Sequence, residues 1–333
     1  MHINDSRNVQ QALISGMRDM NNMGTLQDSR NGKVVSMHCP HTTIYQRPKE
    51  RVLFIPERDA NPFFHLMESL WMLDGRNDVA WLSRFNSRID SYSDDGVTFH
   101  GAYGFRWRQH FQDGDKTVNK DQLSCIINQL LDNPDDRRVV LQMWDPTDDL
   151  GYIGKDFPCN LTATFRVNPA GKLDMTVFNR SNDMIWGAYG ANAVHFSVLQ
   201  EIVATSIGVE VGQYYQISTN HHAYLETFDK YESLLTQEPM ANPYVTGEVT
   251  PFPMMSIDAS SWFQELHMFM EEGAVLGFKD PFFKRVAIPM LMAWDAWKNK
   301  DYPHHMEVAI KNANEIAATD WRKACVEWLE RRV

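Results

Sequence analysis

The stretch Asp156-Phe157-Pro158-Cys159-Asn160-Leu161-Thr162-Ala163-Thr164-Phe165 places a cysteine at the end of a loop, directly before an apolar run that is typical of a strand. A turn signal, Asn168-Pro169-Ala170-Gly171, follows, and then a polar cluster, Asn179-Arg180-Ser181-Asn182-Asp183. A two-strand hairpin over this segment would bring Cys159 and Arg180 side by side. A neighbouring guanidinium stabilises the thiolate, which is the nucleophilic form of cysteine. The alternative is a buried structural cysteine, the commoner role for a lone one.

Length and composition narrow the class of protein. A chain of 333 residues can bury a large core, as one domain or two. No stretch approaches the roughly 18 uninterrupted apolar residues of a membrane span, and the N-terminus lacks the basic and apolar regions of a signal peptide. The net charge of −11 disfavours direct binding of nucleic acid, and makes small nucleotides with locally clustered arginines the more plausible ligands.

The cysteines indicate a reducing compartment. All four are far apart and form no CxxC pair: Cys39, Cys125, Cys159 and Cys325. This argues against a zinc site and a disulfide framework, so we expect a cytoplasmic protein without a metal. The adjacent pair His221-His222 lacks a third ligand nearby and is a poor candidate for metal binding.

Hydrophobic periodicity predicts both helices and strands. Helices are expected over residues 6–23, 62–73, 77–85, 121–131 and 193–207, and strands over 34–45, 139–144 and 214–218. Residues 235–260 are rich in proline and are expected to form a loop. From residue 261 to the end the pattern indicates helices, with aromatic stripes of the kind that usually form core.

Several charged residues have two interpretations. Glu68 lies inside a very apolar helix, where a carboxylate is costly unless it is partnered or protonated, so it is either an exposed helix residue or a buried functional one. Arg30 sits in a turn, as a solvated charge or a phosphate ligand. The pair Arg137-Arg138 precedes a strand, as a solvated edge or as a fork for phosphate oxygens.

An ordered series of motifs resembles the thymidylate synthase family and its sister pyrimidine-nucleotide hydroxymethylases. The resemblance covers about residues 5 to 232. It rests on Glu68-Ser69-Leu70-Trp71, Tyr103-Gly104-Phe105-Arg106-Trp107-Arg108, Asn133-Pro134-Asp135-Asp136-Arg137-Arg138, Pro158-Cys159, Arg180-Ser181-Asn182-Asp183, Asn192 and His222-Ala223-Tyr224. Arg30 occupies the family's N-terminal phosphate-loop position, although the Gly-Thr repeat that usually follows it is absent.

The resemblance implies a fold and an organisation of the chain. The fold is α+β: a mixed, bent sheet flanked by helices, with the nucleotide between the sheet and a long central helix that starts near Asn192. Residues 1–235 would form the catalytic core. Residues 236–333, which do not resemble the ending of the synthases, would form a divergent, mainly helical extension packed on that core.

The resemblance also implies the chemistry. Carbon 5 of a pyrimidine is too weak a nucleophile to attack a one-carbon unit, but thiolate attack at carbon 6 gives an enolate that is nucleophilic at carbon 5. Cys159 would be that thiolate, with its pKa lowered by Arg180, and Glu68 would organise water for proton transfer. The one-carbon donor would be 5,10-methylenetetrahydrofolate, and Tyr103 and Asp183 complete the set of expected catalytic residues.

The remaining motif residues would bind substrate and folate. Arg30, Arg180, Arg137 and Arg138 would hold the nucleotide phosphate, and in this family the Arg137-Arg138 pair reaches across from the partner subunit, which implies a homodimer. The rest of the expected substrate residues are Ser181 beside Arg180, Asn192 for the base edge, and His222 and Tyr224 for the sugar hydroxyl. The expected folate contacts are Asp183, Trp71 and Asn160.

Departures from the family pattern favour hydroxymethylation. The synthases have histidine where this chain has Asn160 and typically cysteine where it has Asn182, and their C-terminal segment that closes over the folate is not visible here. A lid that excludes water favours hydride transfer, whereas a more polar site could admit water. The resulting hypothesis is a hydroxymethylase of deoxyuridine monophosphate (dUMP), because cytosine-specific relatives place an acid at the Asn192 position.

Other functions remain open. They are thymidylate synthesis with release of dihydrofolate, hydroxymethylation of dCMP or CMP, and a nucleotide-binding scaffold of the same fold that has lost the chemistry. Hydroxymethylases of this kind commonly make modified bases for phage DNA or for nucleoside antibiotics. A phage-encoded protein would act in the host cytoplasm.

Overall fold

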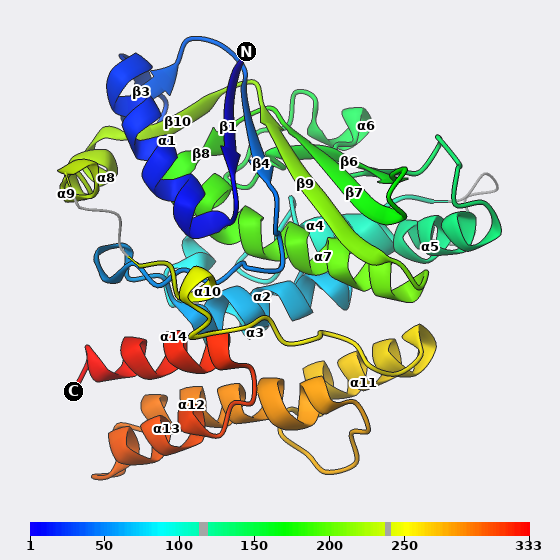
Figure 1. Cartoon of the computed structure of the whole chain (residues 1–333), viewed down its shortest axis with the longest axis vertical. Helices are drawn as coiled ribbons and strands as arrows, with labels where there is room; N and C mark the ends of the chain where they lie inside the picture. The colour runs from blue at the N-terminus through cyan, green and yellow to red at the C-terminus, as the bar shows by residue number, and fades with distance from the viewer. Residues whose placement is uncertain (113–118, 237–240) are drawn as a thin grey trace.

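Two β-sheets form the upper part of the molecule (Figure 1). The computed structural model describes residues 1–112, 119–236 and 241–333. The larger sheet has the strand order β1-β4-β9-β7-β6-β5, and the smaller one has the order β2-β3-β10-β8. The strands are β1 His2–Ser6, β2 Gly24–Ser29, β3 Gly32–Met37, β4 His41–Tyr45, β5 Val140–Gln142, β6 Asn160–Val167, β7 Lys172–Asn179, β8 Asn182–Asp183, β9 Glu210–Ser218 and β10 His221–Tyr224.

The central hairpin forms as predicted. Strands β6 and β7 pair antiparallel, and the turn between them closes through the Gly171 amide, which donates to the Asn168 carbonyl at 2.8 Å. Gly171 has φ of 74°, a left-handed conformation that suits glycine. The register shifts between Asn160 and Thr162, so the ladder is irregular directly after Cys159. Such irregularities re-aim side chains next to functional sites.

One predicted strand is wrong. The run over residues 34–45 is split by residues 38–40 into β3 and β4, which belong to different sheets. Strand β3 pairs with β2 and β10, whereas β4 runs parallel to β1 and antiparallel to β9. Pro40 has no backbone N–H to donate, which suits a break between two strands.

Helices cover one face of the larger sheet and continue to the C-terminus. They are α1 Val9–Met23, α2 Pro62–Leu73, α3 Val79–Ser83, α4 Tyr103–Phe105, α5 Gln122–Asp132, α6 Pro146–Asp149, α7 Asn192–Ser206, α8 Leu225–Lys230, α9 Ser233–Thr236, α10 Pro243–Thr246, α11 Ala259–Glu272, α12 Ile288–Lys298, α13 His305–Asn314 and α14 Thr319–Glu330. Among the described residues no helix is long and apolar enough to cross a membrane.

The central helix α7 is buried on all sides. Every residue from Ala193 to Ala204 is buried, which is the pattern of a helix enclosed by other elements. It packs between the sheet and α2, as Figure 1 shows. Helix α2 begins with Pro62, and the Asn61 side chain accepts the amide of Phe64, so both helix-start signals of the sequence are used. This arrangement confirms the α+β fold and the central helix.

A close backbone contact fixes α4 against α2. A Cβ on Gly104 would lie 2.0 Å from the carbonyl oxygen of Met72, so no larger residue fits. Arg106, two residues after Gly104, is fully buried. Its guanidinium pairs with Asp149 through two contacts of 2.6 and 2.8 Å and also donates to the Met143 carbonyl. A buried charge of this kind needs such complete pairing. The pair ties α4 to the segment that leads into Cys159.

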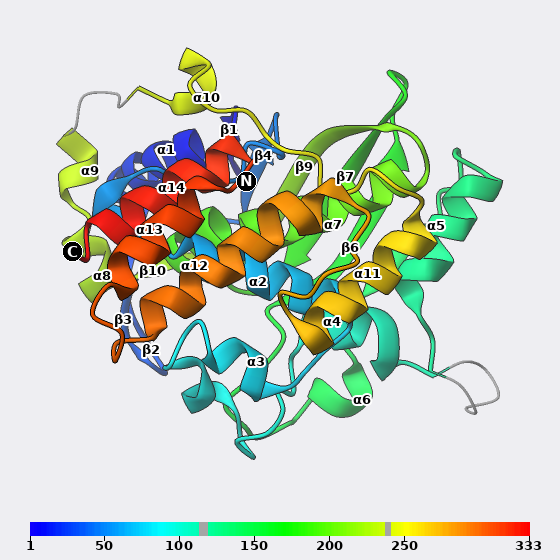
Figure 2. The ribbon, with the colours of Figure 1, turned by 90° about the horizontal axis from the view of Figure 1, so that it is seen from below.

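The C-terminal helices form a separate layer beneath α2 (Figures 1 and 2). The ring of Phe63 in α2 lies 5.5 Å from that of Trp294 and 5.6 Å from that of Trp328. The predicted helices after residue 261 and their aromatic core are therefore confirmed. This layer supports from behind the same helix that carries Glu68.

Asp320 is a buried carboxyl in this layer. It lies at the start of α14 with 1% of its surface exposed, and the Tyr244 hydroxyl donates to it at 2.9 Å. Burial raises the pKa of Asp320 to about 6.

The stability of the fold should therefore depend on pH. Between about pH 4 and 6 the folded chain keeps a proton on Asp320 that the unfolded chain releases. The free energy of unfolding should fall as the pH rises through this window, and Asp320→Asn should remove about 3 kcal/mol of that fall. Urea titrations at pH 4 and pH 7 measure it, with Asp295→Asn at an exposed position as the control. An unchanged pH dependence in Asp320→Asn would contradict the assignment.

Candidate active site

Cys159 and Arg180 meet at the start of the central hairpin, as the sequence predicts. The nearest guanidinium nitrogen lies 3.7 Å from the sulfur of Cys159. The Arg180 guanidinium is itself fixed, because its Nε donates to the Pro158 carbonyl at 2.9 Å. The backbone amides of Cys159 and Asn160 both donate to the Tyr103 hydroxyl, at 3.0 and 3.3 Å. The loop before β6 is thus held from two sides.

Arg180 lowers the pKa of Cys159, as predicted, but the net shift of this pKa is upward. Burial raises the pKa of the thiol, and this effect outweighs the opposing influence of Arg180 and Arg30. The Asp156 carboxylate also raises the pKa of Cys159. Arg180 therefore acts in the expected direction. A buried cysteine was the alternative interpretation of the sequence, but sequence reasoning missed the effect of the carboxylate three residues before the cysteine.

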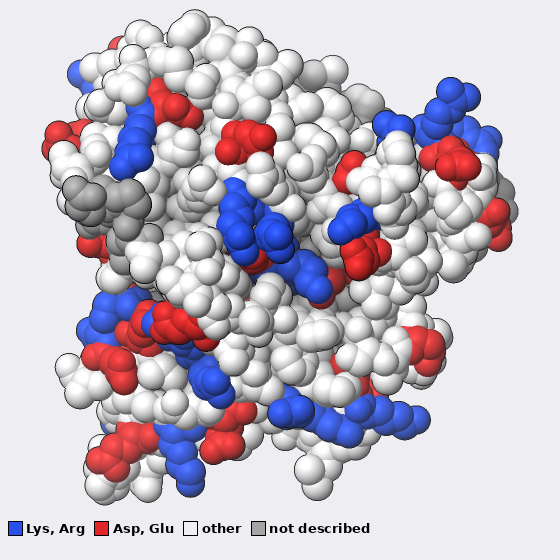
Figure 3. All heavy atoms as spheres, viewed as in Figure 1, with Lys and Arg blue, Asp and Glu red and all other residues white. Residues whose placement is uncertain are grey.

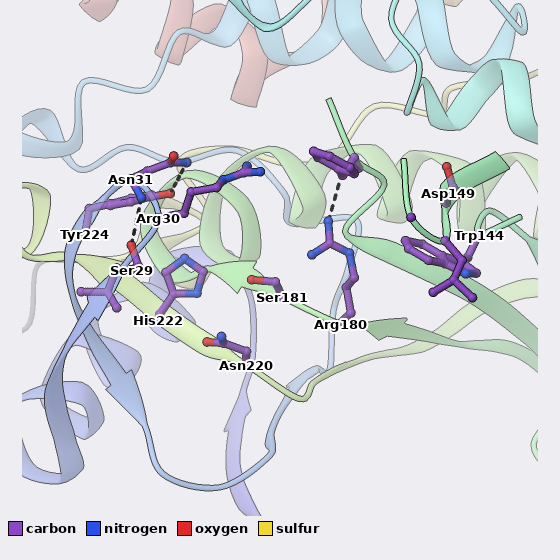
Figure 4. Close-up of a pocket in the computed structure, with 14 residues that line it drawn as sticks. Ser29, Arg30, Asn31, Trp144, Asp149, Arg180, Ser181, Asn220, His222 and Tyr224 are labelled. Atoms are coloured by element: carbon purple, nitrogen blue, oxygen red, sulfur yellow. Dashed lines mark hydrogen bonds between the residues drawn. The ribbon is translucent and has the colours of Figure 1, made fainter. Parts of the chain in front are cut away.

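The first pocket beside Cys159 is basic and polar. It has a volume of about 480 Å³, and Arg30, Arg180, Ser181, His222 and Tyr224 all line it, as predicted (Figure 4). Arg30 comes from the turn between β2 and β3, whereas Arg180 follows β7, so the two guanidiniums arrive from different sheets. Basic side chains also gather near the middle of the face in Figure 3, although the net charge is −11. Such a pocket suits an anion with hydroxyl groups.

A second pocket is lined by Tyr103, the residue whose hydroxyl accepts the amides of Cys159 and Asn160. It has a volume of about 240 Å³ and contains four predicted residues, Glu68, Trp71, Tyr103 and Asn192. Its wall is otherwise largely apolar, with side chains such as Met72 and Phe99. Asp156 and His195 also line it.

Sequence reasoning missed His195, although a signal was present. His195 follows Asn192 by three residues on α7, and residues at this spacing share one face of a helix. Its Nε2 lies 3.1 Å from Oε2 of Glu68, and 4% of the His195 side chain is exposed. Glu68 is therefore partnered inside the protein, which supports the functional interpretation of this carboxylate over that of an exposed helix residue.

A chain of side-chain amides fixes Asn192. Its Nδ2 donates to Oδ1 of Asn182 at 3.1 Å, and its Oδ1 accepts from Asn160 at 3.3 Å. The chain continues in both directions: Asn179 donates to Asn160, and Asn182 donates to Gln216. Both residues that depart from the synthase motifs, Asn160 and Asn182, thus contact the predicted base-reading residue.

Comparison with known proteins agrees with this geometry. The family model described as "Thymidylate synthase" matches residues 12–262. The chain belongs to the thymidylate synthase family. It is 56% identical over 339 residues to the deoxyuridylate hydroxymethyltransferase of Pseudomonas phage M6, covering 100% of this chain and 95% of that relative.

Two further relatives in the thymidylate synthase family match part of the chain. Identity to the deoxyuridylate hydroxymethyltransferase of Bacillus phage SP01 is 40% over 211 residues, which are 62% of this chain and 54% of that protein. The protein of the same name from Delftia phage PhiW-14 is 30% identical over 241 residues, or 69% of this chain and 64% of the relative.

Other residues with a predicted family role lie in different settings. Asp183 caps the π-helical segment Met184–Ala191: its Oδ1 accepts the amides of Ile185 and Trp186, while its Oδ2 is buried without a hydrogen bond among the described residues. Burial raises the pKa of Asp183. Asn160 is fully buried and lines neither pocket, so its contacts point to positioning Asn192, whereas direct contact with folate stays a prediction.

The Arg137-Arg138 pair lines neither pocket. Both residues are exposed, and Arg138 pairs with Asp136 at 2.7 Å. That Arg137 and Arg138 contact the phosphate in the site of a partner subunit therefore stays a prediction. One group in the described part of the chain has spacing that could hold a metal ion: the Nε2 of His110 lies 3.0 Å from a carboxylate oxygen of Asp145 and 3.5 Å from one of Asp148.

The charges around Cys159 predict opposite effects of two substitutions. Arg180→Gln should raise the pKa of the thiol and slow its alkylation near neutral pH, whereas Asp156→Asn should lower the pKa and speed alkylation. The rate of iodoacetamide labelling as a function of pH, followed on the Cys159 peptide by mass spectrometry, measures both. The exposed Arg166→Gln on β6 is the matched control and should leave the rate unchanged. Shifts of the same sign in Arg180→Gln and Asp156→Asn would refute this account.

Proposed function

We propose that this protein transfers a one-carbon unit from 5,10-methylenetetrahydrofolate to carbon 5 of dUMP and produces 5-hydroxymethyl-dUMP. The observation that carries the proposal is the 56% identity over the whole chain to a phage deoxyuridylate hydroxymethyltransferase. The site agrees with it, because Arg180, which contacts Cys159, lines a basic pocket, and Tyr103, which accepts the amide of Cys159, lines a smaller, mainly apolar one.

The reaction begins at Cys159. Its thiolate attacks carbon 6 of the uracil ring, and the resulting enolate attacks the methylene group of the folate from carbon 5. Burial raises the pKa of the Cys159 thiol and so disfavours the thiolate. The positive charges of Arg180 and Arg30 both lower this pKa and so favour the thiolate. Loss of the carbon 5 proton and of tetrahydrofolate leaves an exocyclic methylene group on the ring. Addition of water to that methylene then gives the hydroxymethyl product.

The two pockets divide the substrates between them. The first would hold the dUMP phosphate with Arg30 and Arg180, and its sugar hydroxyl with His222 and Tyr224. Arg137 and Arg138 of a second copy would complete the phosphate site in a homodimer. The second would receive the folate ring against Trp71, and Asn192, which also lines it, would read the base. Asp183 lines neither pocket, and its contact with the pterin is carried by the family resemblance alone.

The fixed amide of Asn192 supports uracil as the base. Its orientation is imposed by Asn160, which donates to its oxygen, and by Asn182, which accepts from its nitrogen. An amide held in this way keeps a donor available for the uracil carbonyl and an acceptor for the ring N–H. Cytosine needs the opposite pattern, so an amide that cannot turn over disfavours it.

Product analysis tests the proposed reaction. The protein is incubated with methylenetetrahydrofolate and dUMP, or dCMP in its place, with mass spectrometry of the nucleotide and absorbance of dihydrofolate as readouts. We expect dUMP to gain one CH₂O unit without dihydrofolate, and Cys159→Ala to lose turnover on the order of 10³-fold or more while still binding dUMP. A methyl product with equal dihydrofolate would make the protein a thymidylate synthase. Turnover that survives in Cys159→Ala would exclude the thiolate mechanism.

Base selection should depend on the amide chain. Asn182→Ala removes the acceptor that orients Asn192, so the preference for dUMP over dCMP, taken as the ratio of kcat/KM values, should fall about tenfold, the worth of one hydrogen bond. The exposed Asn128→Ala on α5 serves as the control. A preference that stays unchanged in Asn182→Ala would show that the amide chain does not set base selection.

A further inference from the structure

His195 and Glu68 form an unusual pair in the wall of the smaller pocket. The Nε2 of His195 and the Oε2 of Glu68 are 3.1 Å apart, within reach of each other. Both atoms are buried, yet neither has a well-oriented hydrogen bond within the described part of the chain. Buried polar atoms are usually satisfied by protein or by ordered water. Both residues also line the pocket, where a bound water could supply the missing partner.

The side chains around Glu68 and His195 restrict what can bind to the pair. The pocket wall around it is largely apolar, with Trp71, Met72 and Phe99 among its residues. An apolar wall with a few polar atoms binds a single water at those atoms and keeps bulk water out. The two side chains come from different helices, Glu68 from α2 and His195 from α7, so their meeting depends on the packing of these helices.

The pair also lines a pocket that contains residues expected to contact the reactants. Asn192, the predicted base reader, is one helical turn before His195 and lines the same pocket. Tyr103 lines it too, and the hydroxyl of Tyr103 accepts the backbone amide of Cys159. Glu68 and His195 therefore line the same pocket as Asn192, the predicted base reader, and Tyr103, which holds the Cys159 backbone.

We infer that His195, together with Glu68, binds and deprotonates the water that adds to the exocyclic methylene group. The inference rests on the proposed hydroxymethylation and identifies a further catalytic residue for it. The imidazole nitrogen takes the proton, and the Glu68 carboxylate 3.1 Å away stabilises the imidazolium that forms.

The step balances without an oxidant or a reductant. The water oxygen forms a bond to the methylene carbon, and the electron pair of the carbon–carbon double bond moves onto the carbon 4 carbonyl as an enolate. One water proton goes to Nε2 of His195. The enolate then re-forms the double bond between carbons 5 and 6, the carbon–sulfur bond breaks, and Cys159 leaves as the thiolate.

The experiment separates this step from those before it. Excess protein is mixed with dUMP tritiated at carbon 5 and methylenetetrahydrofolate, so that a single turnover is followed. Tritium release reports formation of the methylene intermediate, and mass spectrometry reports the hydroxymethyl product. In His195→Gln, tritium release should stay within about threefold of wild type, while product formation should slow on the order of 10²-fold, the contribution of a general base.

A thiol provides the second readout. When 2-mercaptoethanol is added, the waiting intermediate in His195→Gln should be captured as a thioether, which wild type should form far less. His65→Gln, a buried histidine of α2, is the matched control for loss of an imidazole in this region and should form little thioether. Thermal unfolding checks that the variants are folded, and the smaller His195→Asn replaces His195→Gln if the latter is not.

The outcomes distinguish this inference from the proposed function. Equal slowing of tritium release and product formation in His195→Gln, or slowing of neither, would overturn the role of His195 while wild type still makes the hydroxymethyl nucleotide. A wild-type protein that makes the methyl product would instead overturn the proposed function itself.

Discussion

The site depends on one series of amide hydrogen bonds in the interior of the fold, in which Asn160 and Asn182 are buried and Asn192 is half-buried. Asn160 at the start of β6, Asn192 at the start of α7 and Asn182 in β8 are joined by contacts of 3.3 and 3.1 Å. This series therefore links both sheets and the central helix at the point where the cysteine loop enters the fold. Buried polar networks specify one arrangement when every member is satisfied, and they are costly when one member is lost. The position of the nucleophile and the orientation of Asn192 are thus set by the same contacts.

Packing behind the site makes this arrangement rigid. Helix α7 is buried between the sheet and α2, and α2 in turn rests on the aromatic rings of the C-terminal helices. The buried Arg106–Asp149 pair holds the preceding segment from the other side. The C-terminal layer is therefore part of the support of the site, because it determines where the Glu68 side chain of α2 can lie.

The sequence predicted the local features well and the long-range ones less well. The hairpin, the central helix and the meeting of Cys159 with Arg180 follow from turn signals and periodicity, which act over short distances. The strand over residues 34–45 was wrong because Pro40 marks a break locally but does not reveal that the chain changes sheets there. His195 was missed because its partner is on another helix. The lowering of the Cys159 pKa by Arg180 was predicted correctly, but the net rise was not predicted, because burial is a property of the whole fold. The family motifs supplied the remaining site residues.

The two guanidiniums of the basic pocket have a mechanical consequence. Arg30 lies in the turn between β2 and β3 of the smaller sheet, and Arg180 lies where the chain leaves the larger sheet. In the proposed complex a phosphate held by both would cross-link the sheets, so part of its binding energy would go into restraining the β2–β3 turn. Nucleotide affinity and the stiffness of the junction between the sheets would then be two measures of one equilibrium: a looser turn would weaken binding, and a bound nucleotide would stiffen the turn by the same free energy.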